Sequence, residues 1–142
     1  MYTSDISKPM HSLHALKTAL VYLTVSVICI IFDKVYALFG HGVHSTSMSM
    51  MFLYPLLGGT LIFTLAWIII PHSDEVSCYR FFYNIYNSGV AALTVGSVLN
   101  GIFEIAGTSS PYTIAFFILG WTFSAFGLLE YLFSLNRRSQ SR

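Results

Sequence analysis

Four long apolar segments divide the chain, and short polar connections separate them. They cover about residues 13–32, 51–70, 85–106 and 112–135. A helix needs roughly 20 mostly apolar residues to cross a bilayer, and each segment meets this length. The strands of a transmembrane barrel are shorter and alternate between apolar and polar residues, so this pattern excludes them. The pattern therefore predicts an all-α integral membrane protein.

The connections between the later segments are short, with PHSDEVSCYR after the second segment and GTSSP after the third. Short connections make successive helices antiparallel neighbours, so we expect an up-down four-helix bundle that forms one domain over residues 1–142. The first segment is longer than the apolar core of a signal peptide, usually 7–15 residues, and we expect it to be retained. Apolar residues continue beyond it, so this helix can extend or tilt before it breaks at Gly40.

Composition supports a bilayer as the solvent of this chain. Of its 142 residues, 55 % are apolar and only 9 % are charged, and the mean hydropathy is +0.68. A soluble domain carries about 25 % charged residues, so these few charges could not cover a soluble surface. The formal net charge is +1, which gives no case for a nucleic-acid partner. Lipid is the partner that the composition indicates.

Lysines and arginines near the helix ends predict the orientation, because they are enriched in cytoplasmic connections. With the N-terminus inside, only Lys34 lies outside. The residues on the inner side are Lys8, Lys17, Arg80, Arg137, Arg138 and Arg142. Both termini are therefore expected in the cytoplasm, with the first and third connections facing outward. This topology favours the plasma membrane of a bacterium as the location.

The third apolar segment carries a stripe that is small at one end and polar at the other. Ala92, Gly96, Asn100 and Glu104 follow one another at intervals of four residues, so they share one helix face. Ionisable side chains within a membrane are costly and usually face protein or water. One interpretation is a packing face with an interhelical hydrogen bond from Asn100. The other is a functional polar site at Glu104, and both interpretations remain open.

The stretch FGHGVHSTSMSMMF, residues 39–52, combines two histidines with three methionines. The predicted topology places His41 and His44 near the outer end of the helix that carries Glu104. Histidines with a carboxylate suit zinc or iron, whereas Met48 and Met50 would favour Cu(I). The alternative is a surface loop with solvated histidines, in which the methionines simply begin the second helix.

A second set of histidines falls at the predicted inner ends of the first two helices. His14 opens the first helix and His72 follows the second. Antiparallel neighbours bring these ends to one depth, so the two imidazoles could ligate a haem iron from opposite faces. The alternative is that they are interfacial histidines, which lie with Lys8 and Lys17 against anionic lipid headgroups.

Sequence motifs of common enzymes are absent from the chain. We find no Walker A sequence, no G-x-S-x-G elbow, no H-E-x-x-H and no paired C-x-x-C. A non-enzymatic role is therefore the expectation. The leading hypothesis is a membrane protein that binds haem or a transition metal through histidines at helix ends, for sequestration, sensing or electron transfer. The alternatives are a small oligomeric transporter or channel subunit with Glu104 and Asn100 along a polar path, and a non-catalytic subunit of a larger membrane complex.

Overall fold

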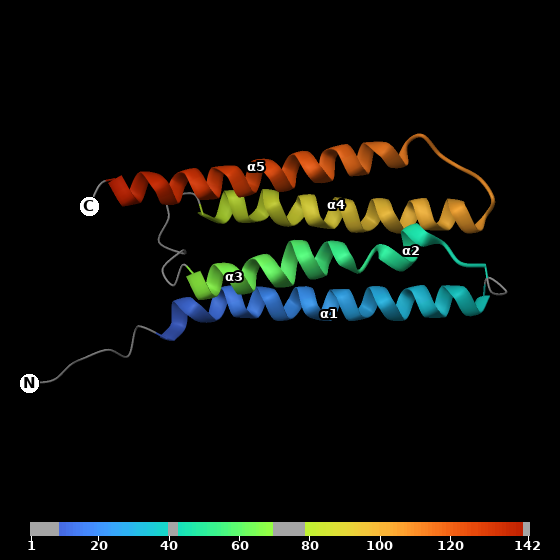
Figure 1. Ribbon diagram of the computed structural model, residues 1–142, viewed down its shortest axis with the longest axis horizontal. Coiled ribbons are helices and arrows are strands. Elements are labelled where there is room, and N and C mark those ends of the chain that lie inside the picture. The colour runs from blue at the N-terminus through green and yellow to red at the C-terminus, as the bar shows by residue number, and fades with distance from the viewer. Residues whose placement is uncertain (1–8, 40–42, 70–78, 141–142) are drawn as a thin grey trace, which may run out of the picture.

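The computed structural model describes residues 9–39, 43–69 and 79–140 (Figure 1). These residues form helices and no strand, which confirms the all-α prediction. The elements are α1 (Pro9–Phe39), α2 (Thr46–Met50), the π-helix η1 (Tyr54–Leu61), α3 (Ile62–Ile69), α4 (Tyr79–Ile105) and α5 (Thr113–Gln140). Four stretches are long and apolar enough to cross a membrane: Ala15–Phe39, Thr46–Ala66, Phe81–Ile105 and Thr113–Phe133. The protein is an integral membrane four-helix bundle.

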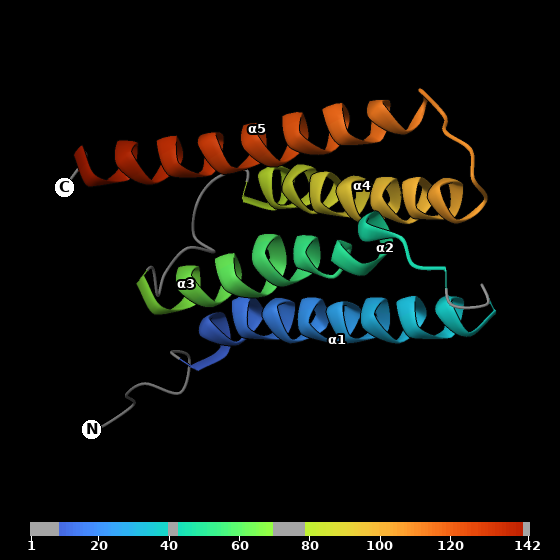
Figure 2. The same ribbon diagram turned by 45° about the vertical axis from the view of Figure 1, so that its right-hand side comes forward.

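Figures 1 and 2 show the spans in the order α1, α3, α4 and α5 from the bottom to the top of the view. The largest contact joins α4 to α5, while α1 packs on η1 and α3, and α2 and η1 pack on α4. The start of α1 and the end of α5 lie at the same end of the bundle. The outer helices expose large apolar side chains such as Leu20, Ile28, Ile118 and Phe133. Lipid is the environment that suits these faces.

Small residues let α4 and α5 approach closely. A Cβ at Gly89 would lie 2.5 Å from the backbone nitrogen of Ser124 and 2.8 Å from the carbonyl oxygen of Gly120. A Cβ at Gly127 would lie 2.9 Å from the backbone nitrogen of Tyr86. Glycine is therefore required at these crossings, as expected where membrane helices pack without bulky side chains.

The second span is discontinuous and starts earlier than the predicted bound of 51. Ser45 has an extended backbone, and its hydroxyl accepts a hydrogen bond from the backbone N–H of Met48 at 3.1 Å. This N-cap satisfies a free donor of the first turn, so the helix begins at Thr46. A turn then separates α2 from η1, where Pro55 lacks a backbone donor. The first span likewise runs to Phe39, beyond the predicted bound of 32.

Candidate functional site

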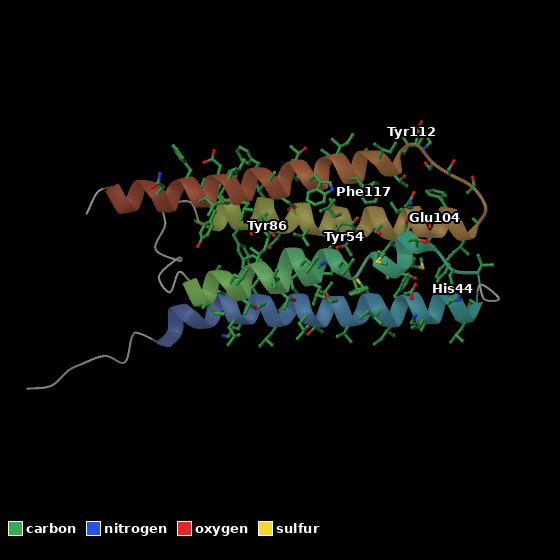
Figure 3. All side chains as sticks on the ribbon, in the orientation of Figure 1. His44, Tyr54, Tyr86, Glu104, Tyr112 and Phe117 are labelled. Atoms are coloured by element: carbon green, nitrogen blue, oxygen red, sulfur yellow. The ribbon has the colours of Figure 1, made fainter. Side chains whose placement is uncertain are left out.

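Glu104, in the last turn of α4, receives hydrogen bonds from the start of the second span. The hydroxyls of Ser45 and Ser47 each donate to it at 2.5 Å, Ser45 to Oε2 and Ser47 to Oε1. Asn100 donates from Nδ2 to Oε1 at 2.9 Å, and the Ser47 backbone N–H lies 3.4 Å from Oε2. We call Glu104, Ser45, Ser47 and Asn100 the carboxylate site; Figure 3 labels Glu104 beside α2. The carboxylate side chain is exposed, yet both of its oxygens are engaged.

Further polar groups surround this site. The Asn100 amide also donates to Ser47 Oγ at 2.8 Å, and the Ser97 hydroxyl donates to the Ser47 carbonyl oxygen at 2.6 Å. From α5, Thr113 Oγ1 lies 3.4 Å from Asn100 Oδ1. The site thus gathers hydroxyl, amide and carboxylate groups from α2, α4 and α5. One negative charge among neutral oxygen groups suits a proton or a hard monovalent cation better than a soft metal ion.

A second carboxylate contacts the same segment from the opposite side. Asp33 of α1 is buried and accepts a hydrogen bond from Ser49 Oγ at 3.0 Å. Its other oxygen lies 3.2 Å from the exposed ammonium of Lys34. Because Lys34 balances the charge of Asp33, the excess negative charge at this end resides on Glu104.

The methionines of the predicted soft-metal set fall on different sides of α2. Met48 is 1 % exposed and packs with Cys29 and Met51 in one core cluster. Met50 is 51 % exposed. A Cβ at Gly101 would lie 2.7 Å from Met48 Cβ, so the absence of a side chain in α4 makes room for Met48. The structure therefore gives Met48 a packing role and separates it from Met50.

The predicted histidine sites lie mostly outside the described residues. His41 and His72 fall in undescribed segments, and the side chain of His14 at the start of α1 is also undescribed. His44 is exposed near the end of α1, whereas Glu104 lies across the molecule against α2 (Figure 3). Within residues 9–39, 43–69 and 79–140, no group of three or more His, Cys, Asp and Glu could hold a metal ion. Haem and metal binding stay predictions.

Sequence reasoning found Asn100 and Glu104 but missed their partners. Ser45, Ser47 and Ser49 alternate immediately before an apolar run. A serine in this position is a typical helix N-cap, and this signal predicts a helix start at 46. The spacing alone does not reveal that the hydroxyls meet carboxylates from two other helices.

A second cluster forms near the start of α4, where this helix packs against the first two spans. The ring of Phe63 lies 5.8 Å from Tyr22, 5.4 Å from Tyr83 and 5.8 Å from Tyr86, measured between centroids. The Tyr22 hydroxyl donates to Asn87 Oδ1 at 2.7 Å. Tyr86 donates to the carbonyl oxygen of Gly58, and Thr18 and Tyr83 share a hydrogen bond of 2.8 Å. We call Phe63 with these three tyrosines the tyrosine cluster.

A line of polar side chains runs along α4 between the two clusters. Their spacing of three or four residues, and of seven between Asn87 and Thr94, keeps them on one side of the helix. Its members are Tyr83, Asn87, Thr94, Ser97, Asn100 and Glu104. Val90 occupies the position between Asn87 and Thr94, is 2 % exposed, and packs with Ala19 and Phe63. We call this line the α4 seam; it is polar toward both ends and apolar at Val90.

Comparison with known proteins identifies no relative. No protein-family model, no curated protein and no solved structure matches the chain.

Proposed function

We propose that this protein is a small membrane transporter or channel subunit for a monovalent cation, either a proton or an alkali metal ion, with Glu104 as its binding residue. The observation that carries the proposal is the carboxylate site. An exposed carboxylate at the end of a spanning helix is surrounded by hydroxyl and amide groups from several segments. Ionisable residues in spanning segments commonly mark ion pathways.

The chemistry of the site supports a cation of single charge. Glu104 supplies one negative charge, and the Ser45 and Ser47 hydroxyls can rotate to present their lone pairs to an ion. Calcium sites usually collect several carboxylates, and soft metals prefer sulfur ligands. Asp33 already faces Lys34, so it adds little free charge. A proton or a sodium-like ion fits this balance.

The α4 seam supports a route across the membrane. Polar groups follow α4 from Glu104 to Tyr83, and the apolar Val90 interrupts them. A hydrophobic constriction between polar stretches is a known way to gate a pathway. We infer that the seam is closed at Val90 in this conformation. Large apolar side chains such as Ile28 and Ile118 are exposed on α1 and α5, which is compatible with a homo-oligomer or with a larger complex.

The distribution of Lys and Arg supports an orientation in which the carboxylate site faces outward from a bacterial plasma membrane. Cations would then meet Glu104 from outside the cell. To test the orientation, Tyr112, which is 82 % exposed near this end, is replaced by cysteine. Intact cells are then treated with an impermeant thiol reagent, which should label this position.

Reconstitution into liposomes tests the function. Uptake of radioactive sodium and rubidium would be measured alongside proton entry reported by an internal pH dye. We expect flux of at least one of these ions, and we expect Glu104→Gln to abolish it because the amide removes the negative charge. Glu104→Asp should retain part of the flux, since it keeps the charge on a shorter side chain.

The matched control is Glu130→Gln, which removes a carboxylate of the α5 span outside the site. Its flux should equal that of the original protein. Equal flux in Glu104→Gln and the original protein would refute the proposed role of Glu104. No flux of sodium, rubidium or protons above that of empty liposomes would refute the transport function itself.

A further inference from the structure

The first turn of the second span is held between carboxylates of two different helices. Ser45 and Ser47 donate to Glu104 of α4, and Ser49 donates to Asp33 of α1. The alternating serines therefore face opposite neighbours. Each of these contacts is a hydrogen bond to a charged group, which is stronger than one between neutral groups.

The same segment is joined to the rest of its span by an irregular stretch of helix. A turn at residues 51–52 follows α2, and the π-helix η1 begins at Tyr54 with Pro55 in its first turn. Proline removes a backbone hydrogen bond, and π-helical turns often occur at functional sites. Backbone hydrogen bonds such as Met51 to Met48 and Tyr54 to Met51 still cross this junction, but Pro55 offers none, so it is weaker than a regular helix.

We propose that α2 is a gate, closed by the charge of Glu104 and opened when that charge is neutralised by a proton or a bound cation. This inference rests on the proposed function for its purpose, but the movement itself is independent of transport. A charged carboxylate can accept all of the hydrogen bonds that Ser45, Ser47 and Asn100 offer it. A protonated carboxyl group carries a hydrogen of its own and accepts fewer of them, so the hold on α2 weakens and the bonds from Ser97 to Ser47 and from Ser49 to Asp33 remain.

Other ionisable groups near the gate are accounted for in the described residues. Asp33 of α1 accepts a hydrogen bond from Ser49, and Lys34 lies beside Asp33. Cys29 and Tyr36 of α1 pack in the cluster of Met48, and His44 is exposed in the segment that leads into α2. Tyr112, just before α5, is also exposed. Asp33 keeps the compensating charge of Lys34, whereas the partners of Glu104 in the carboxylate site are neutral. Glu104 is therefore the group whose neutralisation changes the hold on α2 most.

The methionines of α2 offer a direct readout of this movement. Met48 is 1 % exposed beneath the segment, and Met50 is 51 % exposed on its other side. Hydrogen peroxide converts an accessible methionine to its sulfoxide, which mass spectrometry can locate. Because Met50 lies only two residues from Met48, it serves as an internal reference for reagent, detergent and pH.

The experiment measures the oxidation rate of Met48 relative to Met50 in the protein in detergent, from about pH 8 to about pH 2. The range extends below the usual titration of a glutamate because hydrogen bonds to a carboxylate favour its charged form. We expect the relative rate to rise about five- to thirty-fold as the pH falls. Loss of one or two hydrogen bonds to the Glu104 carboxylate would change the fraction of open molecules by about this factor. Glu104→Gln should show the high rate at every pH. Ser47→Ala, a milder change, should raise the rate at about pH 8.

Circular dichroism on the same samples separates opening of α2 from unfolding. Glu130→Gln is the matched control and should keep the original pH dependence. A Met48 rate that changes neither with pH nor in Glu104→Gln and Ser47→Ala would overturn the gate. If Glu104 proves necessary for flux while Met48 stays protected, the gate is refuted and the transport function stands. If Met48 responds as expected but no ion moves, the gate stands and the transport function fails.

Discussion

At the two ends of the α4 seam, different kinds of contact hold the neighbouring helices together. At the tyrosine cluster, Phe63 touches three aromatic rings from α1 and α4, and hydrogen bonds from the ring hydroxyls tie the same helices together. At the carboxylate site, one charged side chain holds a segment of the second span. Contacts at the tyrosine end involve no charged side chain, whereas several of those at the other end are hydrogen bonds to the Glu104 carboxylate.

This difference indicates which end can move. Burial of several rings does not change with pH or with ion concentration, so the tyrosine cluster can act as a permanent anchor for α1, α3 and α4. Hydrogen bonds to a carboxylate change when its charge is neutralised. On the proposed function, the tyrosine cluster would be the fixed end and the carboxylate site the end that responds to the ion.

Phe63→Ala should produce the largest loss of stability. It leaves a cavity among Tyr22, Tyr83 and Tyr86, and truncation of a buried phenylalanine costs about 3 kcal/mol or more in protein cores. The measurement is unfolding by a denaturing detergent in mixed micelles, followed by circular dichroism. Leu65→Ala, at a 45 % exposed position of the same helix, is the control and should cost much less. Equal losses in the two variants would contradict the anchor role of the tyrosine cluster.

Glu104→Gln should have a smaller effect on stability, about 1 kcal/mol at neutral pH, because it weakens hydrogen bonds at an exposed side chain without opening a cavity. The same unfolding assay measures it. The free-energy difference from the original protein should shrink in acid, where the original carboxyl group is also neutral. A loss as large as that of Phe63→Ala would show that the two ends do not differ as we infer.

Tyr22→Phe should have the smallest effect on stability. It removes the hydrogen bond to Asn87 but keeps the ring stacked on Phe63. Interhelical hydrogen bonds in membrane proteins contribute about 0.6 kcal/mol on average. Tyr112→Phe, at an 82 % exposed position, is the control. A loss well above that of Glu104→Gln would mean that the hydroxyls, and not the rings, hold the tyrosine cluster together.

The histidine hypothesis is tested by an absorption spectrum and a metal analysis of the purified protein. On that hypothesis, added haem gives a Soret band, and His14→Ala and His72→Ala each abolish it because an axial ligand is lost. Stoichiometric zinc, iron or copper without a Soret band would instead point to His41 and His44. A colourless, metal-free protein that takes up neither haem nor metal would contradict the hypothesis and leave Glu104 as the candidate site.

The sequence predicts those features that depend on a single segment. Length and hydropathy find the four spans. Spacing by four also places Asn100 and Glu104 together on one face. Nothing in the α4 sequence reveals that Ser45 and Ser47 are their partners, because contacts between segments depend on how each helix is rotated about its axis.

Because of the π-helix, a prediction that assumes regular α-helices does not give the rotation of α2 about its axis. An α-helix advances about 100° per residue, and a π turn holds more residues than an α turn. The π-helical stretch Tyr54–Leu61 therefore sets an angular offset between α2 and α3 within one span. Deleting a single residue there, such as Leu57, would change the angle between the serines of α2 and Phe63. The span would still cross the bilayer with its hydropathy intact, but its two halves would be out of phase, and either the serines or Phe63 would face the wrong neighbours.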